Sequence, residues 1–172
     1  LHLTNRKLWA IIPAAGSGSR FSKTEFKQYQ IIENKTVLEH TVNRLNDLPL
    51  AGYVLAIGAQ DNYAETLHFK NRQNAHFCLG GAERVDSVLN GLNYLTQFAD
   101  EDDLVFVHDA ARPCVTTQCL ENLVKVAIEQ ETSAILAIPV RDTLKCVEND
   151  QDISKTVSRD YLWQAQTPQI ST

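Results

Sequence analysis

Five short runs of apolar residues, separated by longer amphipathic segments, constrain the fold of this chain more than any other feature. The runs are LWAIIP at 8–13, GYVLAIG at 52–58, HFCL at 76–79, LVFVH at 104–108 and AILAIP at 134–139. Each run has the length of a strand and is almost entirely apolar, which is typical of strands that are buried on both faces. Such strands, each followed by a helix, predict an α/β fold with a mostly parallel twisted sheet and helices on both of its faces.

Four segments between the runs are expected to be helices. They are residues 36–48, 61–70, 82–95 and 117–129. Apolar side chains recur there at spacings of three and four, which places them on one helix face that is expected to pack on the sheet. In the first segment this face comprises Val37, Leu38, Thr41, Val42 and Leu45, and in the third it comprises Val85, Val88, Leu89, Leu92 and Leu95.

Residues 140–160 differ from the rest of the chain. They are mostly polar, alternate weakly, and contain the turn-rich centre ENDQD. This pattern predicts a β-hairpin that projects from the domain, and an exposed surface loop is the alternative. The sequence has no internal repeat and no linker rich in proline and glycine, so residues 1–172 are expected to form a single domain.

Composition and charge limit the possible partners. The chain has 172 residues, of which 44% are hydrophobic, and a formal net charge of −5. This charge argues against a protein that mainly coats nucleic acid or an anionic membrane, so neither is expected as a partner, and an anionic ligand would need a local basic cluster. The four cysteines show no CxxC pair and no zinc-type spacing with the five histidines, which favours a reduced, cytoplasmic setting.

Directly after the first apolar run comes a loop of small residues, PAAGSGSR at 13–20, followed by Lys23 and Lys27. In a parallel sheet this loop lies at the carboxyl end of its strand, where backbone amides can bind phosphate oxygens. Phe21 stands where a dinucleotide fingerprint needs its third glycine and where a P-loop needs its second, so both motifs are excluded. The alternative to a phosphate-binding loop is that Arg20, Lys23 and Lys27 only form a basic loop exposed to solvent.

The ordered motifs resemble those of the cytidylyltransferases that act on polyol phosphates. The matching segments are PAAGxGxR…KQY at 13–29, TVLEHTV at 36–42, GGAERVDSVLNGL at 80–92, VHDAARP at 107–113, PVRDTLK at 139–145 and SRDYLWQAQTPQ at 158–169. Relatives usually have proline immediately before the lysine, whereas this chain has Phe26, so the segment that carries Lys27 is expected to be more pliable. The family continues beyond TPQ, so its C-terminal part is expected to be absent here.

The resemblance implies a three-layer, Rossmann-like nucleotidyltransferase fold and a specific reaction. CMP would pass from CTP to 2-C-methyl-D-erythritol 4-phosphate, giving 4-diphosphocytidyl-2-C-methyl-D-erythritol and pyrophosphate, in non-mevalonate isoprenoid biosynthesis. Ribitol 5-phosphate is the alternative acceptor. The alternative to an enzyme is an inactive fragment that only binds CTP or forms a dimer. A Mg²⁺ cofactor would be bound mainly through the CTP phosphates, with no protein side chain assigned as its ligand.

The resemblance also assigns residues to roles. Arg20 and Lys27 would stabilise the charge on the reacting phosphates, and Arg159 would orient the attacking oxygen. The residues expected to bind CTP are Ala14, Ala15, Gly16, Gly18, Gly81, Arg84, Ser87 and Asp109. Those expected to bind the acceptor are Asp109, Arg112, Thr143, Arg159 and Thr167. The arm at 139–161 would cross to the second subunit of a homodimer, whereas His108 is interpreted as a structural residue.

Overall fold

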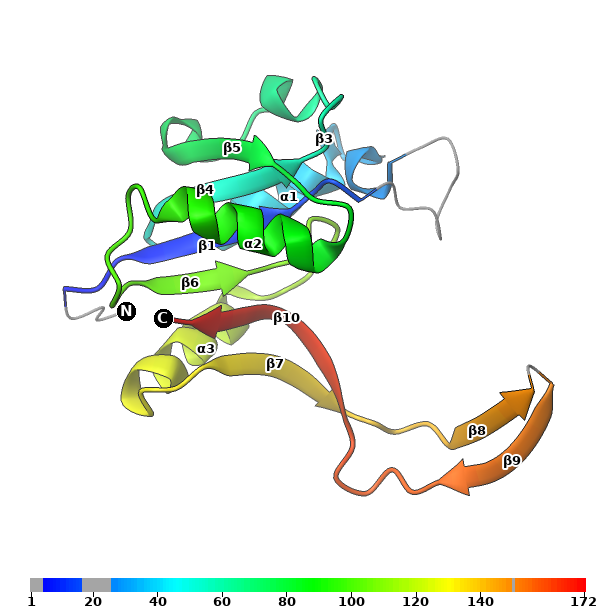
Figure 1. Cartoon of the computed structure of the whole chain (residues 1–172). Coiled ribbons are helices and arrows are strands. Elements are labelled where there is room, and N and C mark those ends of the chain that lie inside the picture. Colours follow the sequence, from blue (N-terminus) through cyan, green and yellow to red (C-terminus); the bar gives the residue numbers. More distant parts are fainter. Residues whose placement is uncertain (1–4, 17–25, 150) are drawn as a thin grey trace.

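One six-stranded sheet organises the computed structural model, which describes residues 5–16, 26–149 and 151–172. Its strand order is β5-β4-β1-β6-β10-β7 (Figure 1). The strands are β1 (Leu8–Pro13), β4 (Leu50–Ile57), β5 (Ala75–Leu79), β6 (Leu104–Val107), β7 (Ala134–Pro139) and β10 (Trp163–Ser171). β5, β4, β1 and β6 pair in parallel, and β10 runs antiparallel to both of its neighbours. The five predicted strands are therefore confirmed, with small differences at their ends.

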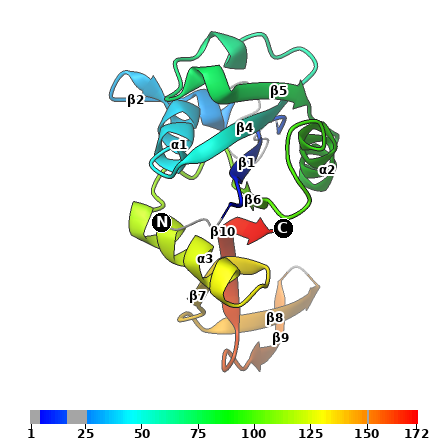
Figure 2. The same ribbon diagram turned by 90° about the vertical axis from the view of Figure 1, so that its left-hand side faces the viewer.

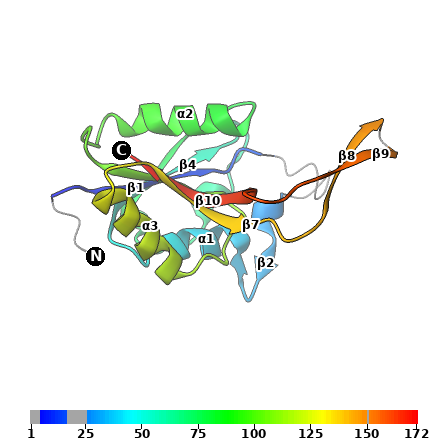
Figure 3. The same ribbon diagram turned by 90° about the horizontal axis from the view of Figure 1, so that it is seen from below.

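Helices cover both faces of the sheet, which confirms the predicted layers. α1 (Val37–Leu45) and α3 (Thr117–Glu129) lie on one face, and α2 (Arg84–Leu95) lies on the other (Figures 2 and 3). β1 shows why a fully apolar strand suits this position, because successive side chains point to opposite faces. Leu8, Ala10 and Ile12 belong to the larger core cluster, whereas Trp9 and Ile11 pack with Leu95 of α2.

α1 begins where the sequence predicts it, and the N-terminal cap explains this boundary. The Thr36 side chain accepts a hydrogen bond from the backbone of Glu39 at 3.1 Å, and the Glu39 carboxylate accepts one from the Thr36 backbone at 2.7 Å. Glu39 also accepts a bond from the His68 backbone at 3.0 Å. Burial raises the pKa of this carboxyl, but these hydrogen bonds together lower it by more than burial raises it. The pKa of Glu39 therefore lies below its usual value. The predicted apolar face of α1 is buried.

The apolar stripe predicted for α2 is wrong in its orientation. Leu95 is buried, but Val85, Leu89 and Leu92 are 67%, 56% and 41% exposed. The helix faces the sheet through Ser87, Gly91 and Leu95, which recur every four residues. A Cβ atom at Gly91 would lie 2.7 Å from Ile11 Cγ2, so only glycine permits this close approach to β1. Two small residues, Ser87 and Gly91, therefore set the packing face together with Leu95.

The helix predicted over 61–70 is wrong. The structure has only one short 3-10 turn there, η2 (Ala64–Thr66). Asp61 Oδ1 accepts hydrogen bonds from the backbones of Tyr63 and Ala64, at 3.0 and 3.1 Å, and so favours a turn over a helix. Farther along, the Lys70 backbone donates to Asn43 Oδ1 at 2.8 Å, which ties the segment to α1 instead of to its own preceding turn.

The predicted hairpin is present and projects from the sheet. β8 (Leu144–Asn149) pairs antiparallel with β9 (Asp152–Val157), well away from the helices (Figure 1). β10 follows it and was not predicted, because its sequence WQAQTPQIS is polar and contains a proline. Two very short strands, β2 (Ile31–Ile32) and β3 (Lys35–Thr36), form a separate antiparallel pair. Within the described residues, no helix has the length and apolar character needed to cross a membrane.

Candidate functional site

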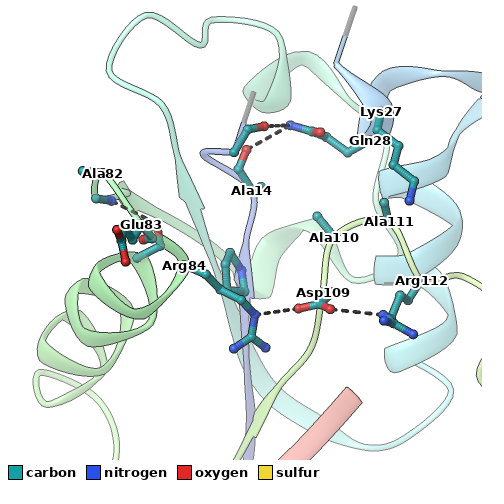
Figure 4. Close-up of a pocket in the computed structure, with 14 residues that line it drawn as sticks. Ala14, Lys27, Gln28, Ala82, Glu83, Arg84, Asp109, Ala110, Ala111 and Arg112 are labelled. Carbon is teal, nitrogen blue, oxygen red and sulfur yellow. Dashed lines mark hydrogen bonds and ion pairs between the residues drawn. The ribbon is translucent and has the colours of Figure 1, made fainter. Parts of the chain in front are cut away.

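A pocket of about 360 Å³ opens at the carboxyl end of the parallel strands (Figure 4). Three loops surround it: the loop after β1, the turn between β5 and α2, and the loop after β6. The residues that line it are Pro13, Ala14, Gly16, Lys27, Gln28, Gly81, Ala82, Glu83, Arg84, Ser87, Asp109, Ala110, Ala111 and Arg112. This edge of an open α/β sheet is where ligands usually bind.

The loop after β1 is held from both of its sides. Ala14 donates its backbone N–H to the carbonyl of Ala56 on β4 at 2.8 Å. On the other side, the Gln28 side chain donates to the Ala14 carbonyl at 3.0 Å. A Cβ atom at Gly80 would overlap the Ala15 side chain, so glycine allows the turn after β5 to approach this loop. The small residues therefore bring two backbone segments together beside the pocket.

Lys27 is one of three cationic residues among the described residues that line the pocket, together with Arg84 and Arg112. It begins the 3-10 turn η1 (Lys27–Tyr29), and its side chain extends toward Ala111 in Figure 4. In the described part of the chain no carboxylate forms an ion pair with it. Phe26 takes φ −74°, within the range that proline would impose, and its ring packs against Tyr29. The backbone before Lys27 thus keeps a proline-like conformation without proline.

The turn between β5 and α2 forms the opposite wall of the pocket. Ser87 is 3% exposed, and its hydroxyl accepts a hydrogen bond from the Gly81 backbone at 3.0 Å. The same hydroxyl donates to the Glu83 carbonyl at 3.2 Å. Ser87 therefore fixes the conformation of this turn, in addition to lining the pocket.

Asp109 joins two arginines at the base of the pocket. Its Oδ1 lies 2.8 Å from Arg84 Nε, and its Oδ2 lies 3.1 Å from Arg112 Nε (Figure 4). Arg112 Nη1 also donates to Gln166 on β10 at 2.6 Å, and the Asp109 backbone donates to the Thr167 hydroxyl at 3.3 Å. Each arginine contacts the carboxylate through Nε, which leaves terminal guanidinium N–H groups to bind an anion.

His108 lies behind this cluster and is fully buried. Its Nε2 is 2.9 Å from the Arg112 carbonyl, and since a carbonyl only accepts, Nε2 carries the hydrogen. Nδ1 has no hydrogen-bond partner among the described residues. Burial lowers the pKa of His108 below its ordinary value, and the hydrogen bond to Arg112 offsets only part of this effect. The neutral imidazole therefore supports the loop that carries Asp109 and Arg112.

Acid should destabilise the folded chain through His108. Its folded-state pKa is depressed, so the unfolded state binds more protons below the ordinary value of 6.5 and stability falls as the pH drops. We expect His108→Gln, which keeps a donor for the Arg112 carbonyl, to flatten this dependence by up to about 1.4 kcal/mol per pH unit between pH 6.5 and 5. Urea unfolding across this range measures the slope. Equal slopes for the two proteins would contradict the account.

The structure brings most of the predicted CTP-binding residues together at the pocket, but fewer of the residues that were predicted to bind the acceptor. Those lining the pocket are Ala14, Gly16, Lys27, Gly81, Arg84, Ser87, Asp109 and Arg112. Ala15 lines a neighbouring cavity instead, and Thr167 is buried next to Asp109. Thr143 and Arg159 are exposed, at the base of the hairpin, and do not line the pocket. Gly18 and Arg20 lie outside the described residues.

Sequence reasoning missed two glutamines. Gln28 lines the pocket and binds the loop after β1, and Gln166 holds Arg112. Both lie inside family-like motifs, KQY at 27–29 and WQAQTPQ at 163–169, yet neutral amides carry no signal of their own for phosphate chemistry. Within the described residues, the structure has no group of three histidine, cysteine or acidic side chains arranged to hold a metal ion.

Comparison with known proteins gives one consistent result. Residues 8–172 match the family "IspD: 2-C-methyl-D-erythritol 4-phosphate cytidylyltransferase". The chain is 71% identical over 171 residues to the 2-C-methyl-D-erythritol 4-phosphate cytidylyltransferase of Acinetobacter baumannii (strain AYE), covering 99% of this chain and 72% of that protein. It is 44% identical over 164 residues to the enzyme of the same name from Vibrio vulnificus (strain YJ016), covering 95% and 69%.

Solved structures agree with the sequence comparison. A crystal structure of a 4-diphosphocytidyl-2C-methyl-D-erythritol synthase superposes with a TM-score of 0.83 at 39% identity, covering 96% of this chain and 74% of that one. The Francisella tularensis 2-C-methyl-D-erythritol 4-phosphate cytidylyltransferase superposes with a TM-score of 0.78 at 36% identity, covering 96% and 72%.

Proposed function

The chain belongs to the IspD family of 2-C-methyl-D-erythritol 4-phosphate cytidylyltransferases, and from this we infer that it transfers CMP from CTP to 2-C-methyl-D-erythritol 4-phosphate. The products are 4-diphosphocytidyl-2-C-methyl-D-erythritol and pyrophosphate, as in non-mevalonate isoprenoid biosynthesis. The observation that carries this inference is a basic pocket at the carboxyl ends of β1 and β6, beside a loop without bulky side chains. Residues 1–172 are interpreted as one nucleotidyltransferase domain with a projecting arm.

The reaction is a substitution at phosphorus. A phosphate oxygen of the acceptor bonds to the α-phosphorus of CTP, the bond from that phosphorus to the bridging oxygen breaks, and pyrophosphate leaves with the electron pair. The chain needs no covalent nucleophile, so its work is to position the reactants and to stabilise the growing negative charge. Lys27, which lines the pocket, stabilises this charge. Arg20 is assigned to the same role.

CTP would lie across the pocket with its triphosphate on the loop after β1. Backbone amides there and Lys27 supply positive potential to the phosphates. The cytosine would lie against the turn after β5, where the Ala14 carbonyl keeps a free lone pair besides its bond to Gln28. Ser87 and the backbone of Gly81 border this position. Close packing of Gly80 on Ala15 leaves little room there for a purine.

The Asp109 cluster would serve both substrates. Arg84 approaches from the α2 side of the pocket, and Arg112 approaches from the side of β10. One carboxylate between two guanidinium groups fixes the planes of both, so their remaining N–H groups face the anions at a low cost in side-chain entropy. We assign Arg112, with Thr167 behind Asp109, to the acceptor side of the pocket, and Arg84 to the CTP side.

Mg²⁺ fits this pocket only as an ion carried by the nucleotide. Both oxygens of Asp109 contact arginines, and the described residues offer no set of acidic side chains that could enclose a cation. When bound, Mg²⁺ neutralises part of the charge on the triphosphate. The side chains of the pocket would then orient the phosphates, with Lys27 and Arg84 placed to do so.

The arm would complete the acceptor pocket of a second subunit. Thr143 and Arg159 are exposed and lie outside the pocket of their own chain, at the base of a hairpin that extends into solvent (Figure 1). In a twofold homodimer the arm of each chain would reach the pocket of its partner. This arrangement supplies Arg159 to orient the attacking oxygen.

Mixed dimers test this arrangement. We expect Lys27→Ala and Arg159→Ala to be inactive alone, and their random mixture to regain about a quarter of the wild-type activity, because half the dimers then carry one intact site of two. Lys27→Ala mixed with Asp109→Asn is the control and should stay inactive, since both residues line the pocket of their own chain and each pocket of a mixed dimer then carries one of the two changes. Absence of any recovery in the first mixture would contradict a shared site.

The acceptor is tested directly by the release of pyrophosphate. With CTP and Mg²⁺, we expect kcat/KM for 2-C-methyl-D-erythritol 4-phosphate to exceed that for ribitol 5-phosphate by at least about 100-fold, since a pocket that binds substrate hydroxyls discriminates strongly. Equal values, or a preference for ribitol 5-phosphate, would overturn the assignment. CTP binding without turnover of either acceptor would instead favour a fragment that binds the nucleotide alone.

A further inference from the structure

The short turn η1 directs three consecutive side chains to three different places. A 3-10 helix has three residues per turn, so adjacent side chains diverge by about 120°. Lys27 extends into the pocket, Gln28 points to the loop after β1, and Tyr29 points away from the pocket to Asp61. The two residues after the lysine therefore attach its turn to separate parts of the fold.

Gln28 is the inner attachment. It is only 5% exposed, and its Nε2 donates to the Ala14 carbonyl at 3.0 Å and reaches the Gly16 carbonyl at 3.5 Å (Figure 4). One amide group has two hydrogens, so a single side chain can bind both carbonyls. The carbonyl and the following N–H of a planar peptide point in opposite directions. When Gln28 draws the Ala14 carbonyl to itself, it turns the N–H of Ala15 the other way.

Tyr29 is the outer attachment. Its hydroxyl donates to Asp61 Oδ2, while Asp61 Oδ1 accepts the backbone N–H groups of Tyr63 and Ala64. The Tyr29 ring makes edge contacts with Phe26 and Tyr63, at centroid distances of 5.8 and 5.0 Å. Burial, followed by the hydrogen bond to Asp61, raises the pKa of Tyr29, so the hydroxyl keeps its proton and remains a donor. This contact fixes the turn to the segment after β4.

We propose that Gln28 is a positioning residue for cytidylyl transfer, which holds residues 14–16, directly after β1, and Lys27 in one fixed arrangement, with Tyr29 as its outer anchor. This inference rests on the proposed function. Phosphoryl transfer depends on placing donors where charge develops, and the two alanines and the glycine at 14–16 have no side-chain hydrogen bonds with which to fix their own peptides. The small residues at 14–16 allow close approach of the triphosphate, and Gln28 supplies the hydrogen bonds that their side chains cannot make.

Gln28→Met tests the proposal, because it keeps the length of the side chain and removes its donors. We expect CTP to bind about tenfold more weakly by calorimetry, which corresponds to the loss of one well-placed hydrogen bond. KM for CTP should rise and kcat should fall, while KM for the acceptor stays within about twofold. A purely structural role would only reduce the active fraction, which lowers kcat and leaves both the CTP affinity and the KM values unchanged.

Asn46→Leu is the matched control. Asn46 is 4% exposed and also donates its amide to a backbone carbonyl, that of Val42 at 2.9 Å, but it lies at the end of α1 and outside the pocket. Both variants should lower the unfolding midpoint, and only Gln28→Met should weaken CTP binding. Equal CTP affinities for Gln28→Met and the wild type would overturn the proposal.

A second pair keeps the proposal testable if Gln28→Met does not fold. Tyr29→Phe removes only the hydroxyl that binds Asp61, and we expect it to weaken CTP about threefold. Tyr53→Phe removes a comparable hydroxyl, bonded to the Lys70 carbonyl at 3.1 Å, and should leave CTP affinity unchanged. Unchanged affinity in Tyr29→Phe would count against the proposal. Wild-type chain that binds CTP without releasing pyrophosphate would overturn the proposed function alone, and wild-type chain that ignores CTP would overturn both.

Discussion

Lys27→Ala should lower kcat by about 100- to 1000-fold, because removing one preorganised donor to transition-state charge has an effect of this size. Lys27 is exposed and lines the pocket, and no carboxylate among the described residues competes for its charge. Its ammonium group is therefore available to the phosphates. For the same reason we expect the free energy of unfolding to stay within about 0.5 kcal/mol of the wild type.

Steady-state release of pyrophosphate measures this effect, and Lys125→Ala is the control. Lys125 is another exposed lysine, on α3, and its ion pair with Glu129 is long at 3.8 Å. We expect that variant to keep kcat within about twofold, since surface pairs of this kind contribute little. If Lys27→Ala kept more than about a third of the wild-type kcat, Lys27 would have no role in stabilising the transition state.

Asp109→Asn should lower kcat/KM by about 100-fold, although the substitution barely changes the shape of the side chain. The carboxylate holds Arg84 at 2.8 Å and Arg112 at 3.1 Å, and a neutral amide would present N–H groups to one of these guanidinium groups. Both arginines would then lose their fixed orientation, and their charges would reach the substrates only in a fraction of conformations. Release of pyrophosphate at several CTP and acceptor concentrations separates the effect on each substrate.

Asp47→Asn is a close control for this change. Asp47 also bridges two cations, Arg44 at 2.9 Å and Lys70 at 3.0 Å, and its side chain is 31% exposed compared with 32% for Asp109. It lies beyond the end of α1 and does not line the pocket. We expect Asp47→Asn to leave kcat/KM within about twofold. Similar losses in the two variants would show that Asp109 affects activity only through stability.

The sequence predicts the sheet better than it predicts the helices. A run such as LWAIIP admits few alternatives, because nearly all of its side chains are buried. The runs that form β5 and β7 are less buried, because these strands lie at the two edges of the sheet. The face that a helix buries is less certain, since close packing can favour small residues. Gly91 shows this, because its lack of a side chain allows α2 to approach Ile11 and leaves Val85 and Leu89 exposed.

Some residues of the pocket can likewise be predicted from the sequence, whereas others depend on contacts that only the fold reveals. Residues that carry charge in a motif, such as Lys27 and Asp109, are assigned by the resemblance of their motifs to those of the family. Gln28 and Gln166 are not assigned, because the importance of a neutral amide depends on which carbonyl or guanidinium group the fold places beside it. β10 illustrates the limit for strands, since a polar segment becomes part of the sheet only through the partners β6 and β7 on either side.

The structure of the chain with CTP and Mg²⁺ tests the central claim most directly, namely that the loop after β1 and Lys27 together bind the triphosphate. We predict phosphate oxygens within hydrogen-bonding distance of the backbone amides at Ala15 and Gly16 and of Lys27 Nζ, with the cytosine beside Gly81 and Ser87. A triphosphate bound away from this loop, or no nucleotide bound at saturating CTP, would contradict the account.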